Sequence, residues 1–330
     1  MKKIIERLIQ HQTLTKDESK EVLKGLATGS FNNSQVAAFL TIYLMRTIRV
    51  EELEGFRDAM LELCIPVDLE GYNAIDVCGT GGDGKNTFNI STISSFIVAG
   101  AGVHVAKHGN YGVSSVSGSS NVLEYLGCKF SNDPERMKES LDKAGICFMH
   151  APLFHPAMKN VAPIRKELGV KTFFNMLGPM VNPALPPNQM VGVFSLELAR
   201  LYGYLYQNTS RNFSIIHSLD GYDEISLTSE FRFVSHTGES LIAPEDLGLE
   251  RIKQESLHGG NTVEDAAEIF KTILKDQGTQ AQHDAAVANA GIAISTVEGI
   301  PHKEGIQRAA ESISSGAALQ SFKKFIEVNH

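Results

Sequence analysis

The chain has 330 residues, of which 42% are hydrophobic and 21% charged, so it is long enough for a large domain plus a small one. Its net charge of −8 argues against general nucleic-acid binding, which needs a basic surface. The longest apolar stretch is too short to span a bilayer, and Glu6 and Arg7 interrupt the N-terminal apolar run too early for a signal peptide. We therefore expect a cytoplasmic protein with reduced cysteines that binds neither membranes nor nucleic acid.

Helical patterns alone occupy the first 70 residues. Thr15 and Glu18 have the spacing of a capping box, which marks the start of a helix. Apolar residues such as Val36 and Leu40 then recur at helical spacing, and Pro66 ends the region. This pattern predicts a small helical domain over residues 1–70.

From Ala74 onward, short β-type runs such as "AIDVC", "VHVAK" and "FSIIH" alternate with helical or glycine-rich segments. The alternation predicts an α/β domain over residues 71–330, with a mostly parallel central sheet and ligands at the carboxyl ends of the strands. Prolines punctuate the stretch 156–183, which we expect to be a helical segment that returns to the N-terminal domain.

The loop "GTGGDGK" (79–85) matches two nucleotide-binding patterns, G-x-G-x-x-G and G-x-x-x-x-G-K. The second needs Ser or Thr where Asn86 stands, and Asp83 would place a carboxylate among the phosphates. The first needs an acidic residue about 20 positions later, but no Asp or Glu occurs between Asp83 and Glu124. Neither pattern therefore describes the loop.

The acid-free span 84–123 carries lysines, many hydroxyls and two further loops, "KHGN" (107–110) and "GVSSVSGSS" (112–120). Loops of this kind expose backbone N–H groups that cradle phosphate oxygens. One such loop alone is equally compatible with a mobile connection. Several in one α/β unit favour a polyanionic ligand.

Two adjacent acids, Asp223 and Glu224, follow an apolar strand and the turn at Asp220-Gly221. They are compatible with a solvated turn or with a magnesium site at the strand end, because Mg²⁺ takes one or two carboxylates plus substrate phosphates. The phosphate-type loops elsewhere in the chain make the second interpretation more attractive.

These motifs together resemble those of the anthranilate phosphoribosyltransferase family. The matching stretches are "DVCGTGGD" (76–83), "NIST" (89–92), "KHGN" (107–110), "HPAMKNVAPIRKELGVKTFFNMLGP" (155–179) and "DGYDE" (220–224). The likeness spans the chain and includes "AAFL" (37–40) in the helical region.

The resemblance implies Mg²⁺-dependent transfer of phosphoribose from phosphoribosyl pyrophosphate to the amine of anthranilate, a step of tryptophan biosynthesis. It also implies the fold shared by nucleoside phosphorylases and phosphoribosyltransferases, and a homodimer assembled through the helical domains. Displacement of pyrophosphate needs metal ions and backbone donors for the departing charge, not a protein nucleophile. That requirement fits a chain in which no Ser-His-Asp or Cys-His constellation is evident, and no catalytic nucleophile is assigned.

The resemblance also assigns residues by position. The residues expected to bind phosphoribosyl pyrophosphate are Gly79, Gly82, Asp83, Thr87, Asn89, Ile90, Ser91, Thr92, Lys107, His108, Gly109, Asn110, Ser114, Ser115 and Ser119. Anthranilate would meet Gly79, Asn110 and Arg165. Ser91 would contact one magnesium ion, and Asp223 and Glu224 would bind a second.

The chain departs from the family pattern at Tyr111, Val116 and His283, where the family commonly has Arg, Lys and Arg. These changes leave two alternatives open: a pyrimidine nucleoside phosphorylase-like enzyme, and a non-catalytic relative that binds nucleic acid or another partner. Arg165 disfavours the first, because a pyrimidine base offers no carboxylate. The two acids after residue 222 and the negative net charge disfavour the second.

Overall fold

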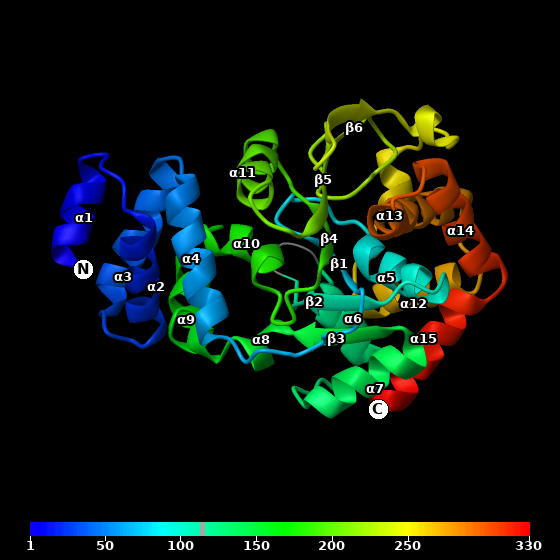
Figure 1. Cartoon of the computed structure of the whole chain (residues 1–330), viewed down its shortest axis with the longest axis horizontal. Helices are drawn as coiled ribbons and strands as arrows, with labels where there is room; N and C mark the ends of the chain where they lie inside the picture. The colour runs from blue at the N-terminus through cyan, green and yellow to red at the C-terminus, as the bar shows by residue number, and fades with distance from the viewer. Residues whose placement is uncertain (113–115) are drawn as a thin grey trace. The chain divides into compact units, whose positions relative to one another are not determined.

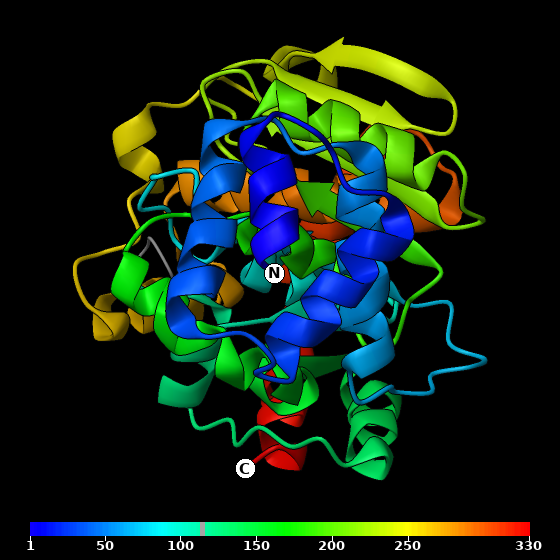
Figure 2. The ribbon, with the colours of Figure 1, turned by 90° about the vertical axis from the view of Figure 1, so that its left-hand side faces the viewer.

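The computed structural model describes residues 1–112 and 116–330. Its contacts divide the chain into two units. The helical unit comprises Met1–Val67 and Ala151–Pro183, and the α/β unit comprises Asp68–His150 and Ala184–His330. A segment from the middle of the chain thus completes the helical unit, and we refer to Ala151–Pro183 as the returning segment (green in Figures 1 and 2).

The helical unit consists of α-helices and short 3₁₀ helices. Their bounds are α1 Lys2–Ile9, α2 Lys16–Ala27, α3 Asn33–Met45, α4 Val50–Leu63, α8 Ala151–Phe154, η1 Pro156–Asn160, α9 Ala162–Leu168, α10 Phe174–Leu177 and η2 Gly178–Val181. The predicted capping box at the start of α2 is confirmed, because the Glu18 N–H donates to Thr15 Oγ1 (3.2 Å) and the Thr15 N–H to Glu18 Oε2 (2.9 Å).

Aromatic rings fill the core of the helical unit. Phe39 and Tyr43 of α3 meet Phe56 of α4 edge to face, and the rings of Phe56 and Phe173 stack at 4.4 Å. Phe173 belongs to the returning segment, so that segment supplies part of the core and does not merely cover it. Such ring pairs add about 0.5–1.5 kcal/mol each beyond the area that they bury.

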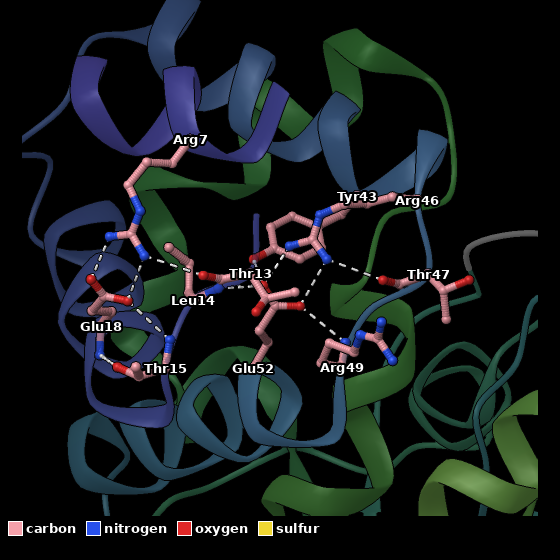
Figure 3. Close-up of polar contacts among 10 residues, drawn as sticks. All are labelled: Arg7, Thr13, Leu14, Thr15, Glu18, Tyr43, Arg46, Thr47, Arg49 and Glu52. Atoms are coloured by element: carbon pink, nitrogen blue, oxygen red, sulfur yellow. Dashed lines mark hydrogen bonds and ion pairs between the residues drawn. The ribbon is translucent and has the colours of Figure 1, made fainter. Parts of the chain in front are cut away.

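A buried carboxylate ties three elements of this unit together (Figure 3). Glu52, on the first turn of α4, is fully buried. It accepts hydrogen bonds from the Leu14 N–H (2.9 Å), the Tyr43 hydroxyl (3.1 Å) and the Arg49 N–H (2.9 Å), and it pairs with the Arg46 guanidinium. The loop before α2, the end of α3 and the start of α4 therefore share one anion.

The α/β unit is built on one sheet. Its strands are β1 Ile75–Gly79, β2 Val105–Gly109, β3 Ile146–His150, β4 Asn188–Gly192, β5 Asn212–Ser218, β6 Phe231–Ser235 and β7 Gly238–Ile242. Within the described residues the sheet has seven strands in the order β3-β2-β1-β4-β5-β6-β7. The first five are parallel, and β6 and β7 form an antiparallel hairpin at one edge (yellow in Figure 2).

Helices cover both faces of this sheet. They are α5 Ile90–Gly100, α6 Ser119–Tyr125, α7 Pro134–Ala144, α11 Leu196–Tyr206, α12 Val263–Leu274, α13 Gln280–Glu298, α14 His302–Ser314 and α15 Ala317–Val328, with short turns η3 Pro244–Leu247 and η4 Gln254–Leu257. Val77 and Met190 point toward the core formed with α5 and α13. Neighbouring residues on a strand face opposite ways, and Gln189, the residue before Met190, accepts from the Tyr206 hydroxyl of α11 (2.7 Å) on the other face. Helix α11 is labelled in Figure 1.

The predicted fold class is confirmed: a small helical N-terminal unit accompanies an α/β unit with a mostly parallel sheet. The β-type runs chosen from the sequence coincide with β1, β2 and β5. None of the helices in residues 1–112 and 116–330 is long and apolar enough to cross a membrane.

Candidate active site

The acidic pair lies at the carboxyl ends of the central strands β1 and β4. A Cβ atom added to Gly79, the last residue of β1, would lie 2.3 Å from Asp223 Oδ2. A Cβ atom on Gly192, the last residue of β4, would lie 1.5 Å from the Asp223 carbonyl oxygen. Only glycine leaves room for Asp223 at both positions, so the two strand ends are shaped to receive it.

The glycine loop and the first turn of α5 supply hydrogen bonds to the same pair. The Gly81 N–H donates to Asp223 Oδ2 at 2.6 Å. Glu224 accepts from the Ser91 N–H (3.1 Å) and, at 3.4 Å, from the Thr87 hydroxyl. The structure therefore brings the glycine loop and the "NIST" element together with the "DGYDE" turn, which follows them by more than 100 residues in the sequence.

These carboxyl groups are short of positive charge. Burial, followed by the neighbouring Asp83, raises the pKa of Asp223 to about 7. Burial and the charge of Asp223 raise the pKa of Glu224 well above its usual value. Lys107 is the cation that acts on Glu224, but it is buried with its Nζ on the Val77 carbonyl (2.5 Å), and burial lowers its own pKa. Burial and mutual repulsion therefore disfavour the charged forms of both acids, and a bound cation would favour those forms.

The donor set suits magnesium. Mg²⁺ prefers one or two carboxylates together with water and substrate phosphate oxygens, rather than a complete cage of protein ligands. The described part of the chain contains no group of three or more His, Cys, Asp or Glu side chains arranged to hold a metal. A cavity of about 10 Å³, enough for one water molecule, lies against Gly79, Ser91, Asp223 and Glu224.

The glycine loop has the geometry of an anion cradle. Gly81, Gly82 and Gly84 adopt φ values of 65°, 80° and 76°, which favour glycine. Asp83 accepts from the Lys85 N–H (2.9 Å), so its carboxylate shapes the loop as well as raising the pKa of Asp223. The turn thus presents the Gly81 N–H to Asp223 at the carboxyl ends of β1 and β4.

Asn89 stands where this loop enters α5. Its Nδ2 donates to the Ser117 carbonyl (2.9 Å), which joins the glycine loop to the segment before α6. Its Oδ1 is buried without a hydrogen-bond partner among the described residues. A buried acceptor of this kind fits a ligand hydroxyl. The neighbouring Ile90 and Thr92 are buried on α5.

The "KHGN" motif covers the end of β2. Lys107, His108 and Gly109 belong to the strand, and the carbonyl of Asn110 accepts from Ser119 Oγ (3.3 Å) at the start of α6. A Cβ atom on Gly109 would lie 2.3 Å from Ser119 Oγ, so this glycine permits the approach. The predicted binding residues Ser114 and Ser115 lie outside the described residues.

Arg165 belongs to the helical unit, on α9. Its guanidinium carbon lies 5.0 Å from the centre of the Phe174 ring, and its Nη2 donates to Asn175 Oδ1 (3.3 Å). Burial lowers its pKa. No carboxylate of the described residues lies within ion-pair distance, so this cation is also available to a ligand.

Several residues that shape the site carry little or no signal in the sequence. Gly192 gave no signal, and its strand β4 was not among those predicted. Asn289 of α13 also lines the cavity, and its signal was one amide within the buried run "DAAVANAG". Ser218, whose hydroxyl donates to the Glu224 carbonyl (2.6 Å), looked like an ordinary strand end.

Models of one protein family match both units. Residues 2–64 match the helical bundle domain of a glycosyl transferase family, and residues 71–319 match its α/β domain. The chain therefore belongs to this glycosyl transferase family. The predicted family and the predicted class of enzyme, a glycosyl-transferring transferase, are confirmed.

The curated relatives carry the name anthranilate phosphoribosyltransferase. That of Christiangramia forsetii is 62% identical over 98% of both chains, and that of Flavobacterium psychrophilum is 60% identical over the full length of both. Among solved structures, the anthranilate phosphoribosyltransferase of Thermus thermophilus has a TM-score of 0.91 at 34% identity and covers 98% of both chains. That of Saccharomyces cerevisiae, in complex with PRPP and Mg, has a TM-score of 0.91 at 28% identity and covers 98% of this chain and 96% of that one. The function predicted from the sequence agrees with these names.

Proposed function

We propose that this chain transfers phosphoribose from phosphoribosyl pyrophosphate to the amino group of anthranilate, with release of pyrophosphate. The observation that carries the proposal is the buried acidic pair at the carboxyl ends of β1 and β4, next to a glycine loop and a helix N-terminus. This arrangement suits a magnesium-bound polyphosphate. The Saccharomyces cerevisiae relative was solved in complex with such a ligand, PRPP with Mg.

The α/β unit would hold the donor substrate. We propose that backbone N–H groups of the glycine loop bind the pyrophosphate and that Asn89 Oδ1 accepts from a ribose hydroxyl. The other predicted binding residues of this unit, from Thr87 through Ser119, are proposed in the same role. Asp223 and Glu224 would hold one Mg²⁺ ion and Ser91 a second. Bound magnesium would neutralise negative charge on the departing pyrophosphate.

The chain's own contribution is to position the reactants and to hold charge. The negative charge that grows on the leaving group would face preorganised backbone donors of the glycine loop. The neutral amine of anthranilate is a competent nucleophile, so no residue is assigned as a base. Arg165 would bind the carboxylate of anthranilate, since its guanidinium is held by Asn175 and Phe174 and lacks an acidic partner in the described chain. Gly79 and Asn110 would contact the same substrate.

Two properties of the whole protein are part of the proposal. We propose a homodimer formed through the helical unit, because apolar side chains such as Ile9 and Met45 are exposed on it (62% and 82%). Light scattering after gel filtration would test this, and a monomer at micromolar concentration would contradict it. We also propose a cytoplasmic location, since all four cysteines are free thiols, as a reducing compartment requires.

The activity is tested directly by the fluorescence of anthranilate. Purified protein with Mg²⁺ and phosphoribosyl pyrophosphate should consume anthranilate and abolish its fluorescence. Omission of Mg²⁺ with added EDTA is the matched control. Folded protein that leaves the fluorescence unchanged at saturating substrates would refute the assignment. Phosphorolysis of a pyrimidine nucleoside would support the alternative enzyme instead.

A further inference from the structure

A buried amide lies directly behind the acidic pair. Asn289 is on α13, is 1% exposed, and lines the same small cavity as Asp223 and Glu224. The residues around it on this helix are alanine, valine, glycine and isoleucine. A buried amide among apolar residues destabilises the fold unless its polar atoms are paired, so its partners indicate why it is there.

Those partners are backbone groups next to the acids. Asn289 Oδ1 accepts from the Ile225 N–H (3.0 Å), and Nδ2 donates to the Ile225 carbonyl (2.9 Å). Nδ2 also donates to the Ala285 carbonyl one turn back on α13 (2.8 Å), which fixes the direction of the amide. One side chain thus holds both backbone polar groups of the residue that follows Glu224.

Two strands, in addition to α13, fix the backbone of the acidic pair. Ser218 of β5 donates to the Glu224 carbonyl at 2.6 Å. The bare Cα of Gly192 on β4 lets the Asp223 carbonyl approach closely. Three consecutive residues, Asp223 to Ile225, are therefore located through their main chain by β4, β5 and α13. Their carboxylates are left to the glycine loop, the start of α5 and a ligand.

We propose that Asn289 is a positioning residue, which sets the place of the Asp223–Glu224 carboxylates so that they meet a magnesium-bound polyphosphate. It does not touch the ligand and acts only through the main chain of Ile225. This inference rests on the proposed function for the identity of the ligand. Groups that orient ligating carboxylates typically change metal affinity or activity by about 10- to 100-fold when they are removed.

The test compares three variants in the full chain. Asn289→Ala removes the clamp on Ile225, and Ser218→Ala removes the independent contact to Glu224. Ser295→Ala is the matched control, because its buried hydroxyl bonds to Gly291 and Pro301 and to no residue of the site. Binding of phosphoribosyl pyrophosphate is measured by calorimetry over a range of Mg²⁺ concentrations, and turnover of anthranilate is measured in parallel.

We expect the Mg²⁺ concentration that gives half-maximal binding to rise about 10- to 100-fold in Asn289→Ala and by less in Ser218→Ala. The KM for anthranilate at saturating Mg²⁺ should stay within about twofold of wild type. Ser295→Ala should lower the melting temperature and leave the Mg²⁺ dependence of binding unchanged. A merely structural role would lower the melting temperature of every variant and leave the Mg²⁺ dependence unchanged, and that result would overturn the inference. If Asn289→Ala does not fold, an unchanged Mg²⁺ dependence in Ser218→Ala overturns it.

Failure of the proposed function gives a different result. Wild-type protein that binds phosphoribosyl pyrophosphate with Mg²⁺ but does not consume anthranilate would contradict the activity. In that case the shift in Asn289→Ala would still support the positioning role. Wild-type protein without Mg²⁺-dependent binding of phosphoribosyl pyrophosphate would overturn both.

Discussion

The helical unit and the α/β unit both bury carboxylates, and they compensate the charge in different ways. Glu52 of the helical unit is surrounded by donors: a guanidinium, a phenol and two backbone N–H groups. Asp223 of the α/β unit has the Gly81 N–H on one oxygen but two further acids, Asp83 and Glu224, beside it. The charge of Glu52 is compensated by donors within its own unit, whereas the acids of the other unit lie beside one another and the buried Lys107 is the cation that acts on Glu224.

The difference separates a structural acid from a site for a ligand. A buried ion pair that is fully bonded within its unit has no capacity left for a ligand, and its removal affects folding. Buried carboxyl groups that repel one another raise the free energy of the folded state until a cation binds. Arg165 is a comparable case of opposite sign, a partly buried cation that has no carboxylate within ion-pair distance among the described residues. In the proposed function, the acidic pair would meet a magnesium-bound anion and Arg165 an aromatic carboxylate.

Glu52, whose charge is compensated within its unit, should have the largest effect on folding. We expect Glu52→Gln to lower the free energy of unfolding by about 3–5 kcal/mol, because it leaves the Arg46 charge buried and unpaired. Urea denaturation measures this, and kcat of the protein that remains folded should change little. Glu18→Gln is the control, since Glu18 pairs with Arg7 at the surface and should cost less than about 1 kcal/mol. An equal loss of unfolding free energy in the two variants would contradict the structural role assigned to Glu52.

Asp223 should behave in the opposite way, with a large effect on turnover and no loss of stability. We expect Asp223→Asn to lower kcat/KM by about 100- to 1,000-fold, the range for loss of one group that stabilises transition-state charge. Its melting temperature without Mg²⁺ should equal or exceed that of wild type, because the substitution removes a repulsive charge. Asp246→Asn, at the turn of η3, is the control for both measurements. Undiminished turnover in Asp223→Asn would contradict the metal role.

The unpaired cation should affect one substrate only. We expect Arg165→Ala to raise the KM for anthranilate about 10- to 100-fold, the range for loss of a charge-assisted hydrogen bond. The affinity for phosphoribosyl pyrophosphate should be unchanged. Arg57→Ala is the matched control, because Arg57 is a partly buried arginine of the same unit that is already paired with Asp58. A KM equal to wild type, or an equal rise in Arg57→Ala, would contradict the assignment.

Features encoded in one short stretch could be predicted from the sequence. The glycine loop, the capping box of α2, and the strands β1, β2 and β5 each follow from local residue types and spacing. The acids at 223 and 224 could be placed at a strand end because an apolar run precedes them. Local chemistry and parallel-sheet topology therefore indicated a phosphate-type loop and a possible metal site, and the resemblance to the family assigned the individual site residues.

Features that depend on contacts between distant segments could not be predicted. Gly192 matters because the main chain of Asp223 passes against it, and Asn289 because Ile225 lies beside it. Glu52 is at the third position of a helix, where a glutamate reads as a capping residue and gives no sign of burial. A sequence pattern records the type of each residue, but the partner that neutralises it comes from the fold.

The smallest expected effect concerns a third way to bury a titratable group, which is to leave it neutral. His155, in the returning segment, has its Nε2 on the Val181 carbonyl (2.9 Å), and burial lowers its pKa from 6.5 to about 4. Between these values the unfolded chain takes up a proton and the folded chain does not, so stability should fall as the pH drops from about 6.5 toward 4. The loss at pH 5 should be about 2 kcal/mol relative to pH 7.

The variant His155→Gln isolates this contribution, because an amide can donate to the same carbonyl but does not titrate. The difference in urea stability between wild type and variant should therefore change by that amount between pH 7 and pH 5, with wild type losing more. His11→Gln, at an exposed turn, should follow wild type at both pH values. If the difference between wild type and His155→Gln is independent of pH, His155 is not buried in its neutral form.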